Sequence, residues 1–148
     1  MKGPTAATST FECSIDIDAA PKVVFGYFTD PVAILEWIGD HAVLDAQPGG
    51  EFTLDIEGIP VRGRYVHVEA PERIVVTWGH AGSATMPPES TEVEFTFVPT
   101  SSGTHVKVAH RLLPDEHAAS HQVGWPMFLD RLRGVFASAE NAPVERNE

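Results

Sequence analysis

The stretch STEVEFTFVPTSSGTHVKVAHRLLP, residues 90–114, decides the fold. Apolar and polar residues alternate on both sides of the Ser101-Ser102-Gly103 turn, which predicts two half-buried strands joined as a hairpin. One face of this hairpin is apolar and needs a cover. The side chains expected on that face are Val93, Phe95 and Phe97 from the first strand, and Val106, Val108 and His110 from the second.

The same period of two extends towards the N-terminus. Turn residues separate the alternating segments, notably Pro48-Gly49-Gly50 and Pro71-Glu72-Arg73. Together with the hairpin, these segments predict an antiparallel sheet of about seven strands. The upstream segments are FECSIDID (11–18), AVLDAQ (42–47), EFTLDIEG (51–58), VRGRYVHVEA (61–70) and IVVTWGH (74–80).

Helical signals lie between the first two strands and after the last one. Pro21 suits the first turn of a short helix, and Asp30-Pro31 suits the start of a second that Gly39 ends. After Pro114 the spacing predicts a long helix over 115–139. Its apolar stripe is expected at Val123, Met127, Leu132 and Val135, widened by Trp125, Phe128, Leu129 and Phe136.

An antiparallel sheet with one apolar face needs an element to bury that face, and the long C-terminal helix is the natural cover. The expected fold is therefore α+β, with a curved sheet around the long helix and two short helices after the first strand. A strongly curved sheet leaves space under the helix for a ligand. We expect one domain over residues 11–139, with flexible termini at 1–10 and 140–148.

This order of elements resembles the START-like (SRPBCC) superfamily, the helix-grip fold of polyketide cyclases and the birch-pollen allergen. Its branch resembling the activator of heat-shock-protein-90 ATPase is the closer likeness, over roughly residues 11–137. The residues that carry it are Ala20-Pro21-x-x-Val24-Phe25, Thr29-Asp30-Pro31, Trp37, Pro48-Gly49-Gly50-Glu51-Phe52, Pro71 to Trp78, and Gly124-Trp125 with Phe128-Leu129.

The superfamily resemblance implies a fold but no single activity, because its members include ligand carriers, cyclases, stress proteins and co-chaperone modules. We expect the chain to bind a small apolar or amphipathic molecule, such as a lipid or polyketide, between sheet and helix. Two alternatives stay open. One is a cyclase- or hydratase-like enzyme on a polyketide-like substrate, and the other is a chaperone-associated interaction module.

Alternation and helical spacing name the side chains expected around the cavity: Phe52, Leu54, Trp78, His80, Val93, Phe95, Val106, Val108, His110, Met127 and Phe128. His80 and His110 are the expected polar handles, since neutral imidazole both donates and accepts hydrogen bonds and titrates near neutral pH. Their alternative position is at strand ends in solvent. The short helices and the loop 81–88 are expected at the mouth, with the loop as a gate.

Other chemistry has less support. Cys13 falls on the apolar face of the first strand, where a thiol is usually inert. His117 and His121 share a helical face, but no HExxH motif or cysteine pair accompanies them, so we expect two exposed histidines and no metal site. Arg62, Arg64 and Arg111 are expected on the outer face. His80 and His110 are the candidate acid or base of the enzyme alternative, the catalytic residues stay unassigned, and no cofactor is expected.

The composition of the chain disfavours some classes of binding partner. The 148 residues carry a formal charge of −11, which disfavours nucleic acid and anionic lipid surfaces. No segment is as apolar as a signal peptide or a membrane span, so we expect a cytoplasmic protein without stable membrane association. The sequence leaves open whether the chain forms a homodimer.

Overall fold

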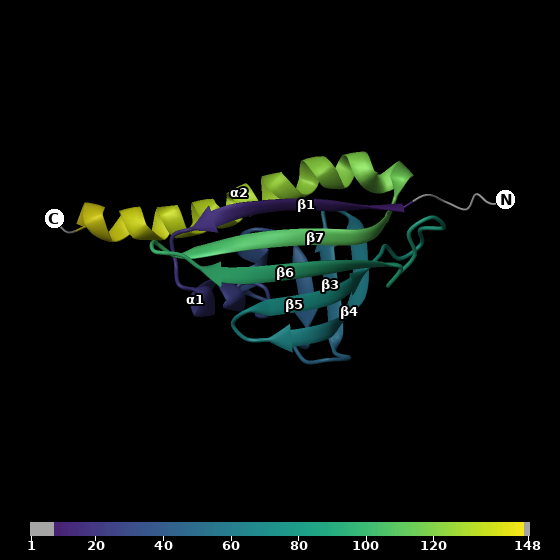
Figure 1. Ribbon diagram of the computed structural model, residues 1–148, viewed down its shortest axis with the longest axis horizontal. Helices are drawn as coiled ribbons and strands as arrows, with labels where there is room; N and C mark the ends of the chain where they lie inside the picture. Colours follow the sequence, from purple (N-terminus) through teal and green to yellow (C-terminus); the bar gives the residue numbers. More distant parts are fainter. Residues whose placement is uncertain (1–7, 147–148) are drawn as a thin grey trace.

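A computed structural model describes residues 8–146 of the chain, with side chains as far as residue 137. Seven strands form one sheet in the order β1-β7-β6-β5-β4-β3-β2, and every neighbouring pair is antiparallel (Figure 1). The predicted sheet is thereby confirmed. The strands are β1 (Thr8–Ile17), β2 (His41–Leu44), β3 (Glu51–Ile56), β4 (Ile59–Glu69), β5 (Arg73–Trp78), β6 (Thr91–Pro99) and β7 (Thr104–Pro114).

The β6–β7 hairpin has the register that its alternation predicts. Val93 lies opposite His110, Phe95 opposite Val108, and Phe97 opposite Val106. All six side chains are buried on the concave side of the sheet. This face continues into β5 and β3, whose Trp78 and Leu54 are also buried.

Two short helical segments follow β1, as expected: the helix α1 (Pro21–Gly26) and the 3₁₀ turn η1 (Ala33–Glu36). Asp30 Oδ1 accepts hydrogen bonds from the backbone N–H groups of Val32 (2.8 Å) and Ala33 (3.3 Å), which fixes the entry to η1. Trp37 follows η1 directly and is buried. These segments therefore close one end of the space under the sheet.

The long helix α2 (Asp115–Arg146) runs alongside β1 (Figure 1). Its buried side chains are Trp125, Leu129 and Leu132, whereas Val123 and Met127 are 70% and 41% exposed. The expected apolar stripe is confirmed at Trp125, Leu129 and Leu132 and was wrong at Val123 and Met127, which lie on the opposite side of the helix. Large aromatic and aliphatic side chains on the other face bury more apolar surface, and they set the rotation of the helix.

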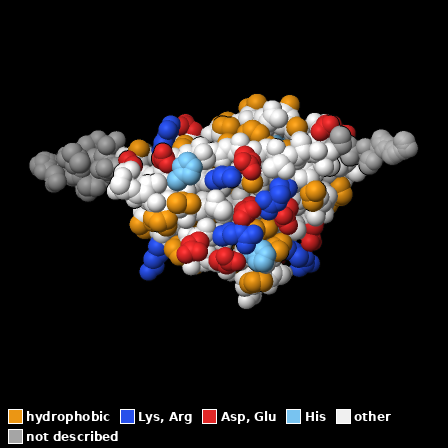
Figure 2. All heavy atoms as spheres, viewed as in Figure 1, with side chains coloured by type: hydrophobic (Ala, Val, Ile, Leu, Met, Phe, Trp, Pro, Cys, Tyr) orange, Lys and Arg blue, Asp and Glu red, His pale blue; other side chains and the backbone are white. Residues whose placement is uncertain are grey.

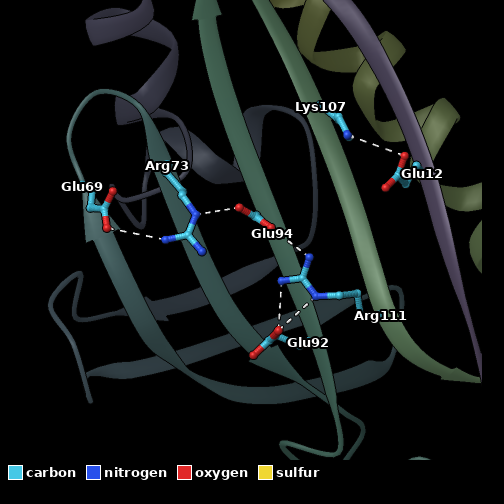
Figure 3. Close-up of polar contacts among 7 residues, drawn as sticks. All are labelled: Glu12, Glu69, Arg73, Glu92, Glu94, Lys107 and Arg111. Carbon is cyan, nitrogen blue, oxygen red and sulfur yellow. Dashed lines mark hydrogen bonds and ion pairs between the residues drawn. The ribbon is translucent and has the colours of Figure 1, made fainter.

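Charged side chains occupy the convex face of the sheet, where Figure 2 shows acidic and basic groups interleaved. Figure 3 shows the network at its centre: Arg73 bonds Glu94 (2.6 Å), and Arg111 bonds Glu92 (2.9 Å) and Glu94 (2.8 Å). Arg62 pairs with Asp55 (2.8 Å). The expectation that the arginines of the sheet lie outside is confirmed, and none of these guanidinium groups lines the cavity described below.

The bounds of the outer elements differ slightly from expectation. β1 begins at Thr8, and α2 extends to Arg146. Flexible termini were expected at 1–10 and 140–148, and of these positions 1–7 and 147–148 lie outside the described residues. Within the described part of the chain, no helix is long and apolar enough to cross a bilayer.

Candidate functional site

A cavity of about 170 Å³ lies under the sheet, between the β3–β4 hairpin and the first half of α2. Its walls are mostly apolar. Trp78 and Trp125 contribute aromatic rings, and the polar side chains are two histidines, a serine and a glutamate. The lining residues are Ile38, Ile56, Glu57, Ile59, Val61, Trp78, His80, Ser120, His121, Gly124, Trp125 and Phe128.

Local sequence explains why this space is open. Glu57 and Gly58 both have positive φ values, 50° and 86°, so β3 turns directly into β4 and presents Ile56 and Ile59 beside the turn. On the opposite wall Gly124 has no side chain. A Cβ atom built there would meet only the Phe128 ring, at 3.7 Å. The absence of a side chain at Gly124 therefore leaves room for a ligand.

Trp78 forms the boundary between this cavity and a second, much smaller void deeper in the core. Phe52, Leu54 and Phe95 line that inner void. The Trp78 side chain is buried, and its indole N–H has no hydrogen-bond partner within the described part of the chain. A buried donor without a partner is costly.

His110 is buried and its hydrogen bonds fix its tautomer. The Trp125 indole N–H donates to Nδ1 (3.1 Å), so Nδ1 carries no proton. Thr91 donates its hydroxyl to the Trp78 carbonyl (2.7 Å) and therefore accepts from His110 Nε2–H (2.8 Å). Burial lowers the pKa of His110 to about 2, so this ring is a neutral link between β7, β6 and α2.

His121 lies on the cavity wall and has one ring nitrogen left for a ligand. Its Nδ1–H donates to the backbone carbonyl of His117 one turn earlier (2.9 Å), which leaves Nε2 as a lone-pair acceptor. Burial is the main cause that lowers the pKa of His121. The pKa of His80 is also lowered, first by burial and then by the nearby His121 and His117. Both cavity imidazoles are therefore neutral at neutral pH.

Four imidazoles meet at this end of the molecule, and we call His80, His110, His117 and His121 the histidine cluster. The His121 ring lies 4.9 Å from His110 and 6.2 Å from His80, and the His80 ring lies 6.0 Å from His117. His117 Nε2 also bonds the Thr85 hydroxyl (2.8 Å). Within residues 8–137 no group of three such side chains is arranged to hold a metal ion.

The structure distributes the eleven expected site residues among four places. Trp78, His80 and Phe128 line the cavity, whereas Phe52, Leu54 and Phe95 line the inner void. Val93, Val106, Val108 and His110 are buried in the core and border neither space. Met127 is exposed, because it lies on the side of α2 that faces away from the sheet.

Sequence reasoning missed His121 and Gly124 as neighbours of Trp125 in the cavity wall. A signal was present, because positions 121, 125 and 128 follow helical spacing and Trp125 is the largest side chain of the helix. His117 and His121 were expected in solvent because no metal-binding motif accompanies them. Both side chains are instead half-buried against His80.

The loop 81–88 does not border the cavity, which contradicts its expected role as a gate. Backbone bonds hold it in place, from His80 N–H to the Met86 carbonyl (2.8 Å) and from Ala81 N–H to the Pro60 carbonyl (2.9 Å). Met86 is fully buried. Met86 therefore anchors the loop, although a single apolar side chain among small and polar residues gives no periodic pattern in the sequence.

Cys13 agrees with its expected inert role. Its side chain is half-buried on β1, and burial raises the pKa of the thiol to about 11. A thiol with such a pKa stays protonated at neutral pH and is a poor nucleophile. The chemistry of the site therefore depends on imidazole and indole groups.

Residues 18–137 match the family model described as activator of Hsp90 ATPase homolog 1-like protein (AHSA1). The chain belongs to this AHSA1-like family. The matched range contains every strand except β1, as well as the whole cavity wall. No curated protein sequence matches the chain.

Solved structures of AHSA1-like and related proteins have the same fold. The AHSA1-like protein of Rhizobium etli is 31% identical, with a TM-score of 0.74 over 93% of this chain and 87% of that one. A Mesorhizobium loti protein is 23% identical, with a TM-score of 0.76 over 95% and 99% of the two chains. An Aha1 dimer from Colwellia psychrerythraea is 19% identical, with a TM-score of 0.75 over 86% and 96%. The AHSA1-like fold supports a ligand-binding domain in general terms.

Proposed function

We propose that this AHSA1-like protein binds a small, uncharged, mainly apolar molecule in the cavity between the β3–β4 hairpin and α2. The observation that carries the proposal is a mostly apolar cavity of about 170 Å³ that Trp78, Trp125 and His121 line together. Ligand sites typically combine such apolar walls with a few placed polar groups. The ligand-binding domain would comprise residues 11–139.

The polar groups limit the chemistry of the ligand. Trp78 carries an indole N–H without a partner among the described residues, which would suit a ligand carbonyl or ether oxygen that reaches it. His121 Nε2 offers an acceptor, which suits a hydroxyl or N–H group. Glu57 is the carboxylate in the cavity wall, and no lysine or arginine lines it, so a ligand anion would meet like charge without a partner. The site therefore favours neutral molecules over carboxylates.

The test uses prodan, a neutral fluorescent naphthyl ketone, titrated into the folded protein. We expect saturable one-to-one binding with a negative heat-capacity change, because apolar surface leaves water. Gly124→Leu fills the cavity and should weaken binding by at least ~10-fold. Gly134→Leu is the matched control on the exposed side of α2, where an added Cβ meets nothing within 4 Å, and it should bind as wild type does.

A second variant tests the proposed hydrogen bond between Trp78 and the ligand. Trp78→Phe keeps an aromatic ring and removes the N–H, so prodan affinity should fall about 5-fold, the value of one ordinary hydrogen bond. Affinity for dimethylaminonaphthalene, which lacks the carbonyl, should change far less. If folded Gly124→Leu binds both probes as wild type does, the cavity is not the site, and the interaction-module alternative moves ahead.

Acid–base catalysis is a second candidate because His121 is already oriented for it. Its Nδ1–H bond to the His117 carbonyl fixes the ring and leaves Nε2 as a base in the cavity. A base beside a polarised ketone would remove and return an α-proton. The test is solvent deuterium exchange at the α-carbon of bound prodan, followed by NMR. Wild type should accelerate exchange and His121→Gln should not, and equal exchange rates would remove this candidate.

A further inference from the structure

The first third of α2 is attached to the sheet differently from the rest of the helix. No side chain in 115–124 is fully buried, whereas Trp125, Leu129 and Leu132 are. In this segment His117 and His121 are the side chains that contact His80 and His110. Apart from Ala118, which packs against the apolar core, the histidine contacts attach this segment to the sheet, whereas Trp125, Leu129 and Leu132 attach the next two turns by apolar packing.

We propose that the histidine cluster is a proton-operated latch, which holds residues 115–124 of α2 over the cavity at neutral pH and releases them when the imidazoles become protonated. The role of the latch in ligand release rests on the proposed function above. The opening of the helix segment does not, because it follows from contacts within the chain.

The contacts in the histidine cluster need neutral rings. His110 Nδ1 accepts the Trp125 N–H, and a proton on that nitrogen would break the bond between β7 and α2. Charged His80 and His121 rings 6.2 Å apart would repel each other in surroundings of low polarity. Burial and the neighbouring rings already hold the pKa of His80, His110 and His121 below the ordinary value. Protonation of these histidines at low pH therefore breaks the contacts that hold the cluster together.

Few negatively charged groups face the histidine cluster to stabilise protonated imidazole rings. The loop after β5 and strand β6 present hydroxyls, Thr85 to His117 and Thr91 to His110. The β3–β4 turn brings one carboxylate, Glu57, to the cavity wall. The first turn of α2 carries Asp115 and Glu116. Among the described residues, the histidines with a carboxylate within ion-pairing distance are His41 and His105, not those of the cluster.

Hydrogen exchange of the ligand-free protein tests the latch directly. Protection factors, corrected for the intrinsic pH dependence of exchange, are compared at pH 7.5 and pH 5.5. We expect amides of residues 118–124 to lose at least ~10-fold of their protection at pH 5.5 and to exchange faster than those of the β6–β7 hairpin, because the local opening precedes global unfolding. Exchange of both segments at the same rate, or protection of residues 118–124 that does not change with pH, would overturn the proposal.

Matched histidine variants separate the latch from general acid sensitivity. His121→Gln removes the titrating ring and should reduce the pH response of residues 118–124 by at least half. His105→Gln, an exposed histidine paired with Asp16 at the other end of β7, should leave that response unchanged. A His121→Gln protein with the wild-type pH response would contradict the latch.

The readouts also distinguish this proposal from the proposed function. If prodan fails to bind at pH 7.5, the ligand site is refuted, and the exchange data still decide whether the helix segment opens. If prodan binds at pH 7.5 and dissociates at pH 5.5 while residues 118–124 keep their protection, the latch is refuted and the ligand site stands. If protection and prodan are lost together, both proposals are supported.

Discussion

The space between sheet and helix has a closed end and an open end, which differ in what fills them. At the closed end the Phe28 ring lies 4.8–4.9 Å from the rings of Trp37, Phe95 and Phe97. At the open end the same sheet and helix enclose about 170 Å³. One architecture can therefore be packed for stability or left hollow for binding, depending on side-chain size at facing positions.

The largest expected effect comes from emptying the closed end. Phe28→Ala should lower the free energy of unfolding by ~3–5 kcal/mol, because a fully surrounded ring leaves a cavity that the neighbouring rings cannot fill. Urea denaturation measures this loss. Val32→Ala, at a site 75% exposed, should leave stability within ~0.5 kcal/mol of wild type. A loss below ~1 kcal/mol for Phe28→Ala would show that the closed end is not the main source of stability.

The open end should instead make stability depend on pH. The pKa of His110 is about 2 in the folded protein, far below its ordinary 6.5, so the unfolded chain binds more protons in acid. Stability is thus full above pH 6.5 and decreases as the pH falls towards the folded value. Between pH 6.5 and pH 5 the loss from His110 should be about 2 kcal/mol. His80 and His121, whose pKa values are also lowered, add in the same direction.

Urea denaturation at several pH values between 5 and 7 measures this slope. Glu94, whose pKa is lowered chiefly by its bond to Arg73, contributes in the same sense only near and below its ordinary value of 4.5, outside most of this window. The histidines therefore dominate the expected change. A free energy of unfolding that stays flat from pH 7 to pH 5 would show that His110 is not held neutral by the fold.

The two ends also differ in how far the sequence predicts them. Strict alternation in β6 and β7 predicts the sheet and its concave face, because a slip of one residue would expose Val93 and Phe95. The rotation of α2 was not predictable in this way. Apolar residues surround the helix, so Val123 and Met127 fit a stripe as well as Trp125 and Leu129 do.

The approach of the four histidines could not be predicted from the sequence for a related reason. His80 and His121 are 41 positions apart in the chain, and their approach depends on the rotation of α2 and on the loop that Met86 anchors. Neither feature has a periodic signal. The orphan N–H of Trp78 is likewise a property of packing, since a tryptophan on an apolar face gives no sign of whether its indole finds a partner.

The smallest expected effect compares two glycines of the same helix, and it separates stability from binding. Glycine within a helix is destabilising relative to alanine, so Gly124→Ala and Gly134→Ala should each raise the free energy of unfolding by ~0.5–1 kcal/mol. The added methyl at Gly134 meets nothing within 4 Å, and the one at Gly124 makes ordinary contact with Phe128 at 3.7 Å. Neither change therefore introduces strain.

Binding should respond at one of the two positions only, because Gly124 lines the cavity and Gly134 does not. Prodan affinity should fall a few-fold in Gly124→Ala, where the methyl group takes part of the ligand volume, and should be unchanged in Gly134→Ala. Isothermal titration and urea denaturation on the same samples give both quantities. A Gly124→Ala protein that gains stability and loses affinity would show that the open end is kept hollow at a cost in stability. Equal affinity in both variants would place the ligand away from α2, and the contrast between the two ends would then no longer be one of function.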